Sequence, residues 1–311
     1  MDFPISLSGQ PSMIHCVEMH TTGEPTRIIY KGFPSLPGTL LEQRALAKAN
    51  HDHIRQQLIL EPRGHWDMYG AVLCPDTELV ASGEAHIGVL FMHNEGFSTM
   101  CGHATIALGR FLVDTHDLRI FPKRNELVYD EVERTTMIDL HAPCGVVKIT
   151  VPCKENGYRS DGMRQVSFVS VPSFATGIQI DVPIPENLRW PQLGNRASLV
   201  ADISYGGTFY CIVPAVEMGF LGTLKKIDRA AMNISTRSLK EEINTNPKLQ
   251  QYLRHPDSED LGFLYSVMVV DASIGVAAED TAGVETGLCF FADQQVDRSP
   301  TGGAVASRVA L

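Results

Sequence analysis

The sequence predicts an α/β protein of the α+β type, built from two related, pseudo-symmetric halves. Strand-like and helix-like segments are mixed along the 311 residues, and the β-rich segments dominate. The segment MCGHATIALGR (Met100–Arg110) also aligns weakly with PTGGAVASRVA (Pro300–Ala310). In both segments a cysteine or threonine precedes a glycine and an apolar helical run. A chain of this length holds two domains of ordinary size, so we expect one copy in each half.

The first elements are a pair of strands and a helix. Residues 13–30 are predicted to form two strands joined by a turn at Thr22-Gly23-Glu24-Pro25. Thr39–Ile59 is rich in good helix formers and stops before Pro62, which favours a helix. The other segments typical of strands are Gly70–Cys74, Ala85–Asn94, Met137–Leu140, Gly145–Val151, Val166–Val171, Phe209–Val213, Phe263–Val270 and Leu288–Phe291.

Three further helices are predicted. A short apolar helix follows Cys101, and a longer one occupies part of Asp228–Leu253, where NTNP (residues 244–247) interrupts it. The last helix begins at the paired glycines after Thr301.

Composition restricts the class of protein. The formal net charge of -10 argues against nucleic acid as a partner but not against a small anionic substrate. No apolar run reaches the roughly 18 to 20 residues of a membrane span, and residues 1–16 lack the pattern of a signal peptide. Seven scattered cysteines without C-x-x-C spacing favour reduced thiols, so we expect a cytoplasmic protein without a metal site.

Cys101 is the first candidate catalytic residue. At a helix N-terminus, unpaired N–H groups and the helix dipole favour negative charge. We therefore expect the pKa of this thiol to be lowered toward neutrality, which suits a base or nucleophile. Gly102 would let a ligand approach the same N–H groups. The alternatives are a buried structural thiol for Cys101, and a cap or packed ring for His103 instead of substrate contact.

Thr301 occupies the equivalent position in the second copy. A threonine hydroxyl does not abstract a proton from carbon unaided, but it can exchange hydrogen bonds or hold a water. Asp297 could pair with a substrate ammonium group or cap its own turn. If the two helices face each other, the site has one ionisable group on one side and a hydroxyl on the other.

Five motifs, spread from Met13 to the end of the chain, resemble the proline racemase family and occur in that family's order. They are HTTGEPTR (20–27), PRGHWDMYGA (62–71), MCGHATIALGR (100–110), YGGTFY (205–210) and FADQQVDRSPTGG (291–303). The second and fourth motifs are glycine-rich junctions that could line a pocket or form structural turns. The resemblance implies two halves, each a β-barrel-like sheet around a central helix as in diaminopimelate epimerase, with the active site in the cleft between them. It also implies an N-terminal half at 13–160 carrying Cys101, and a C-terminal half at 161–311 carrying Asp297 and Thr301.

The family resemblance also implies a reaction. Racemases of this family use two cysteines, one on each side of the substrate's α-carbon, and racemisation needs two titratable groups. Here the second cysteine is replaced by Thr301, a combination similar to the branch that dehydrates trans-3-hydroxy-L-proline. That branch needs no cofactor. By position, Cys101 is the general base and Asp297 holds the ring nitrogen, while Gly102, His103, Gly302 and Gly303 bind the carboxylate.

Two other functions stay open at this point. One is a racemase or epimerase of proline or 4-hydroxyproline, in which a water on Thr301 supplies the second acid. The other is an inactive ligand-binding remnant. The oligomeric state is not given by the sequence, and a homodimer is one assembly that stays open.

Two positions depart from the family. Ala304 stands where members usually have a further glycine, and we expect it to crowd the backbone near the substrate. Members also continue for several dozen residues past Leu311, completing the second central helix, so we expect an uncovered apolar surface there.

Overall fold

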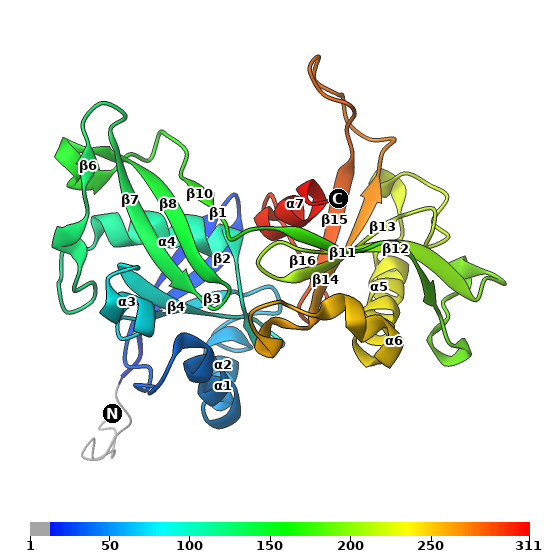
Figure 1. Cartoon of the computed structure of the whole chain (residues 1–311), viewed down its shortest axis with the longest axis horizontal. Coiled ribbons are helices and arrows are strands. Elements are labelled where there is room, and N and C mark those ends of the chain that lie inside the picture. The colour runs from blue at the N-terminus through cyan, green and yellow to red at the C-terminus, as the bar shows by residue number, and fades with distance from the viewer. Residues whose placement is uncertain (1–12) are drawn as a thin grey trace, which may run out of the picture.

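Two β-sheets, each packed against a helix that points toward the centre of the molecule, organise the chain (Figure 1). The structure is a computed structural model and describes residues 13–311, so most of the segment predicted to lack a signal peptide lies outside the described residues. Among residues 13–311, no helix has the length and apolar character needed to cross a membrane.

The first sheet has the order β1-β2-β3-β4-β7-β8-β10, with three short strands at its margins. The pairs β2–β3 and β4–β7 are parallel, and the other pairs are antiparallel. Its strands are β1 (His15–Thr21), β2 (Glu24–Lys31), β3 (Gly70–Cys74), β4 (Ile87–Met92), β5 (Phe97–Ser98), β6 (Tyr129–Asp130), β7 (Thr135–Ala142), β8 (Gly145–Lys154), β9 (Arg159–Ser160) and β10 (Ser167–Val169).

Helix α4 (Gly102–Asp114) is the central helix of the first half and packs against β1, β2 and β8. Ala104, Leu108 and Leu112 follow one another at helical spacing and are fully buried. Gly109 allows the close approach, because a Cβ there would lie 2.8 Å from a methyl group of Ile149. The sequence therefore determines both which face of α4 is buried and how near it comes to the sheet.

The predicted helix at 39–59 is two helices. Helix α1 (Leu40–Asn50) begins at a capping box formed by Thr39 and Glu42, and α2 (Asp52–Ile59) follows after a break at His51. Helix α3 (Glu78–Ser82) is a single short turn that the sequence did not predict.

The second sheet has the order β11-β12-β13-β14-β15-β16. Helix α7 (Gly302–Val309) packs against β12 and β13, and α5 (Arg229–Thr245) packs against β14. Asn246 separates α5 from α6 (Pro247–Gln250), so the helix is interrupted within the NTNP segment as predicted. The strands are β11 (Phe174–Pro183), β12 (Ser198–Tyr205), β13 (Phe209–Pro214), β14 (Leu264–Asp271), β15 (Thr286–Phe291) and β16 (Gln295–Val296). Short 3-10 turns lie at Arg124–Glu126, Glu155–Gly157, Glu186–Leu188, Pro191–Leu193, Leu224–Lys226, Gln251–Leu253 and Glu259–Leu261.

The predicted strands are present, but β11 and β12 were missed and the boundary between halves lies later than 160/161. Strand β10 returns to pair with β8, so the chain leaves the first sheet only after Val169. The segment 202–210, interpreted as a glycine-rich junction, is the end of β12, a turn, and the start of β13. Two register shifts within β11 explain why a regular alternation of apolar residues is not visible there.

One hydrophobic core crosses between the halves. It joins the face of α4 to residues of the second sheet, including Tyr210, Tyr265 and Phe291. A second core lies between the second sheet and α5, and a third lies beneath α1 and α2. On α7, Val305 and Val309 are 53% and 80% exposed.

Candidate active site

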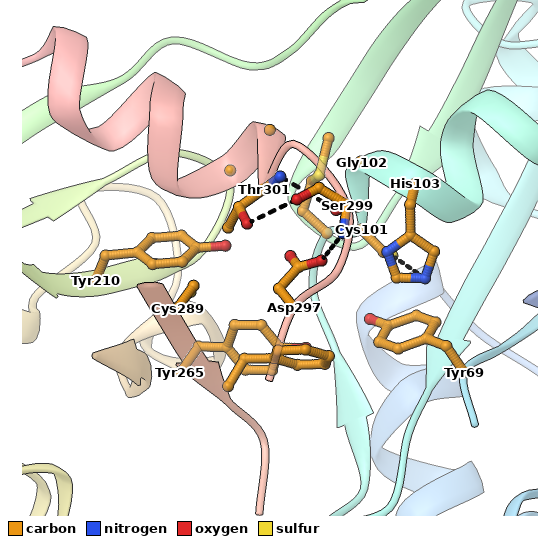
Figure 2. Close-up of a pocket in the computed structure, with 14 residues that line it drawn as sticks. Tyr69, Cys101, Gly102, His103, Tyr210, Tyr265, Cys289, Asp297, Ser299 and Thr301 are labelled. Atoms are coloured by element: carbon orange, nitrogen blue, oxygen red, sulfur yellow. Dashed lines mark hydrogen bonds between the residues drawn. The ribbon is translucent and has the colours of Figure 1, made fainter. Parts of the chain in front are cut away.

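A pocket lies where the N-termini of α4 and α7 meet (Figure 2). Cys101 is the N-cap of α4, and Thr301 is the N-cap of α7. The two helix starts nearly touch, since a Cβ on Gly102 would lie 3.5 Å from the Cα of Gly302. Every residue predicted for the site lines this pocket: Cys101, Gly102, His103, Asp297, Thr301, Gly302 and Gly303.

Cys101 and His103 form a buried pair. The Sγ atom of Cys101 lies 3.3 Å from Nδ1 of His103, and the two residues are 7% and 4% exposed. Burial lowers the pKa of His103 to about 4, against the opposing effect of Asp297. At neutral pH the imidazole is therefore uncharged, and one ring nitrogen can accept a proton from the thiol.

The predicted lowering of the pKa of Cys101 is wrong. Burial raises the pKa of this thiol well above its usual value. Hydrogen bonds from the backbone N–H of Ala104 and from Tyr69 act in the opposite direction but do not prevail. The sequence revealed the helix terminus, but it did not reveal that the thiol is enclosed by the second half of the protein.

The loop between β16 and α7 forms the second side of the pocket. Oδ1 of Asp297 accepts a hydrogen bond from the Ser299 backbone N–H at 2.7 Å, so Asp297 does cap a turn. The Ser299 side chain in turn accepts from the Thr301 N–H at 3.1 Å. Thr301 has a φ of 50°, in the left-handed region, which aims the start of α7 at the pocket. Asp297 lies at the centre of the pocket in Figure 2.

Glu24 attaches this loop to the first half. Its Oε2 accepts hydrogen bonds from the backbone N–H of Arg298 at 3.0 Å and from Nε of Arg298 at 3.2 Å. Burial raises the pKa of Glu24 to about 7, and the neighbouring Arg298 opposes that rise. No local pattern indicated this contact, because Glu24 lies in a segment that was predicted to be a turn and is instead the first residue of β2.

An aromatic wall completes the pocket, and the predicted set of site residues did not include it. Two of its members, Tyr69 and Tyr210, belong to motifs that had been considered as pocket linings. Tyr265 and Cys289 lie within ordinary apolar strands, where no local pattern marks them as site residues, and Phe291 is both the last residue of β15 and the first residue of the fifth motif. The lining residues that were not predicted are Tyr69, Met100, Tyr210, Tyr265, Cys289, Phe291 and Ser299.

Ala304 is fully buried in the core and does not line the pocket. The expected crowding near the substrate is therefore not seen at this position. Within residues 13–311, no group of three or more histidine, cysteine or acidic side chains is arranged to hold a metal ion.

Comparison with known proteins gives consistent results. A family model described as "Proline racemase" matches residues 16–311. A trans-L-3-hydroxyproline dehydratase of Pongo abelii is 42% identical over 304 residues, which cover 96% of this chain and 75% of that protein. A trans-3-hydroxy-L-proline dehydratase of Homo sapiens is 41% identical with the same coverage of both chains.

The fold also has a match among solved structures. A hydroxyproline epimerase from Agrobacterium vitis, solved with bound trans-4-hydroxy-L-proline, superposes with a TM-score of 0.72 at 22% identity. The match covers 96% of this chain and 75% of that one. It agrees with the predicted arrangement of two sheets with a helix packed on each.

Proposed function

Because the chain belongs to the proline racemase family, we propose that its pocket dehydrates trans-3-hydroxy-L-proline to Δ1-pyrroline-2-carboxylate. One observation carries this choice of reaction within the family. The two facing helix N-termini present a thiol at Cys101 and only a hydroxyl at Thr301. With a thiol at only one of the two helix starts, the site can remove the α-proton but has no matching thiol to return a proton from the opposite face.

The substrate carboxylate binds between the helix starts. The free backbone N–H groups at Gly102 and His103 and at Gly302 and Gly303 converge there, and both helix dipoles favour an anion. As the α-proton leaves, negative charge moves onto the carboxylate, so the same N–H groups stabilise the transition state more than the ground state. Asp297 faces the substrate's ring nitrogen and pairs with its ammonium charge.

Cys101 removes the α-proton in its thiolate form. The neutral imidazole of His103 lies at hydrogen-bond distance from its sulfur, and the backbone N–H of Ala104 and the Tyr69 hydroxyl act to lower the pKa of the thiol. The carbanion-like intermediate then expels the 3-hydroxyl group. The resulting Δ2-pyrroline-2-carboxylate tautomerises to the Δ1 imine.

The proposal is tested by incubating the purified protein with trans-3-hydroxy-L-proline and following imine formation. We expect turnover by the wild type and a loss of at least about 1,000-fold in Cys101→Ser, because a serine hydroxyl is a far weaker base. Cys16→Ser, at an exposed cysteine outside the pocket, is the matched control and should keep full activity. Full dehydration by Cys101→Ser would remove Cys101 from its assigned role.

A second arm separates dehydration from racemisation. In heavy water, L-proline should exchange its α-hydrogen with retention of configuration, since only one face has a base. Deuterated proline of inverted configuration would instead favour a racemase.

The cysteines favour the cytoplasm as the location. All seven are free thiols and six of them are buried, an arrangement that suits a reducing compartment.

A further inference from the structure

We propose that Tyr69 is the general acid that protonates the departing 3-hydroxyl group. This inference rests on the proposed dehydration and adds a second catalytic residue to it. Hydroxide is a poor leaving group, so expulsion of the 3-hydroxyl is much faster when a positioned acid delivers a proton to the oxygen. Cys101 takes up a proton in this reaction, so another group must supply the proton for the hydroxyl.

The stereochemistry of the substrate determines where the acid must stand. In trans-3-hydroxy-L-proline the carboxylate and the hydroxyl lie on opposite faces of the ring. The α-hydrogen and the hydroxyl therefore share one face. Since Cys101 must approach the α-hydrogen, the hydroxyl also departs on the Cys101 side. Thr301, on the other side, faces the wrong surface of the ring to protonate it.

Tyr69 lies on the Cys101 side of the pocket. Its ring meets that of His103 edge to face, with centroids 4.8 Å apart, and its hydroxyl points into the pocket in Figure 2. Tyr69 and Cys101 both line this pocket, and each group influences the pKa of the other. Tyr210 stands on the opposite side, where a Cβ on Gly303 would meet its hydroxyl.

The Tyr69 hydroxyl carries the proton it needs and is held in place. The side chain is 1% exposed, and burial raises the pKa of Tyr69 well above its usual value, so it is protonated at neutral pH. Its Oη lies 2.5 Å from Oγ of Ser98. Ser98 can donate to the phenolate that remains after the proton has left, and this hydrogen bond opposes the rise in the pKa of Tyr69.

All the proton transfers of the elimination take place among the substrate, Cys101 and Tyr69. The Cys101 thiolate forms an S–H bond with the α-hydrogen, and the C–H electron pair forms the C2–C3 double bond. The C3–O bond breaks, and its oxygen takes the Tyr69 proton and leaves as water. The Cys101 thiol then returns its proton to the Tyr69 phenolate, which restores both groups.

The test uses Tyr69→Phe with two substrates. Trans-3-fluoro-L-proline has the same geometry, but fluoride leaves without requiring a proton. We expect Tyr69→Phe to lower the rate of imine formation from trans-3-hydroxy-L-proline by about 100-fold or more, while fluoride release stays within a few-fold of the wild type. In heavy water the variant should also still exchange the α-hydrogen of L-proline. Tyr205→Phe, which removes a buried hydroxyl outside the pocket that has no hydrogen-bond partner in the described chain, should leave all three rates unchanged.

Two results would overturn the assignment. Equal losses of water and fluoride elimination in Tyr69→Phe would mean that Tyr69 only positions Cys101, and undiminished dehydration would mean that another group is the acid. If the wild type itself forms no imine, the proposed function fails and this inference fails with it. Wild-type turnover combined with either result in the variant removes only the role of Tyr69.

Discussion

The two residues at the helix starts differ chiefly in carrying a thiol or a hydroxyl group, and in the proposed mechanism that difference selects the reaction. Cys101 can hold a negative charge beside backbone N–H groups, whereas the Thr301 hydroxyl donates to the Ser299 carbonyl at 3.4 Å and stays neutral. Thr301 has a left-handed backbone conformation with a φ of 50°, which β-branched residues disfavour more than unbranched ones. A residue of similar size should therefore fit there without moving α7.

Thr301→Cys is expected to add the missing second base. Because a thiol would then stand on each side of the α-carbon, the variant should invert L-proline to D-proline at a measurable rate, which the wild type should not do. Chiral chromatography after incubation with L-proline measures this directly. Thr301→Ser keeps a hydroxyl and serves as the control. Equal inversion by the serine and cysteine variants would contradict the one-base account.

In the proposed mechanism, the N-termini of α4 and α7 together bind the substrate carboxylate. Each contributes a glycine at its first position, and these glycines bring the two N-termini together around the carboxylate site. Phe168 covers both glycines, since a Cβ on Gly102 or Gly302 would lie 3.3 or 3.1 Å from its ring. The gap between the two helix starts is therefore narrow, and the Phe168 ring covers one side of it.

Gly102→Ala is expected to weaken substrate binding more than it weakens the fold. The added methyl group would occupy the gap between the helix starts and separate the carboxylate from the backbone N–H groups. We expect KM to rise by about 10-fold or more, with a loss of stability of about 1 kcal/mol or less, because alanine favours the helix. Steady-state kinetics and urea denaturation measure the two effects. Gly162→Ala, where a Cβ meets nothing within 4 Å, controls for the substitution. An unchanged KM would contradict this placement of the carboxylate.

Contacts between the halves keep the site assembled across the whole molecule. Thr99 donates to the Gly207 carbonyl at 2.7 Å, and Nζ of Lys240 lies 2.9 Å from Oε2 of Glu95. The contact between Glu24 and Arg298 is the one that lies beside Asp297. It also introduces a dependence on pH, because Glu24 is held in a buried position.

Glu24→Gln should change how stability varies with pH. The folded pKa of Glu24, about 7, lies above the 4.5 of an unperturbed glutamate, so the folded state binds more protons between those two pH values. The contribution of Glu24 to stability is thus fully present below about pH 4.5 and is lost as pH rises through about 7. The loss is at most about 3 kcal/mol. The difference in unfolding free energy between wild type and variant, measured in urea at pH 5 and pH 8, should move in favour of the glutamine at pH 8. Glu186→Gln, at an exposed position, should show no such change. A constant difference for Glu24→Gln would contradict this account.

Local patterns in the sequence were sufficient to predict much of the fold and the site residues at the two helix starts. Helical spacing and a glycine after Cys101 and Thr301 predicted both central helices, and every residue in the predicted site lines the pocket. Strand β11 was missed because its register shifts hide the alternation of apolar residues. Tyr265 and Phe291 were missed because a strand residue that faces a pocket has the same apolar neighbours as one that faces a core.

By itself, the sequence determined which chemical groups stand at the two helix starts, and therefore that one side of the site has a base and the other does not. These are properties of short segments, in which side chains and backbone N–H groups are neighbours along the chain. Only the tertiary structure decided the state of those groups. The enclosure of Cys101 by the second half raises the pKa of its thiol, and the same packing brings Tyr69 and Glu24 to the site. Burial and contact between distant segments depend on how the two halves meet, and no local pattern records that.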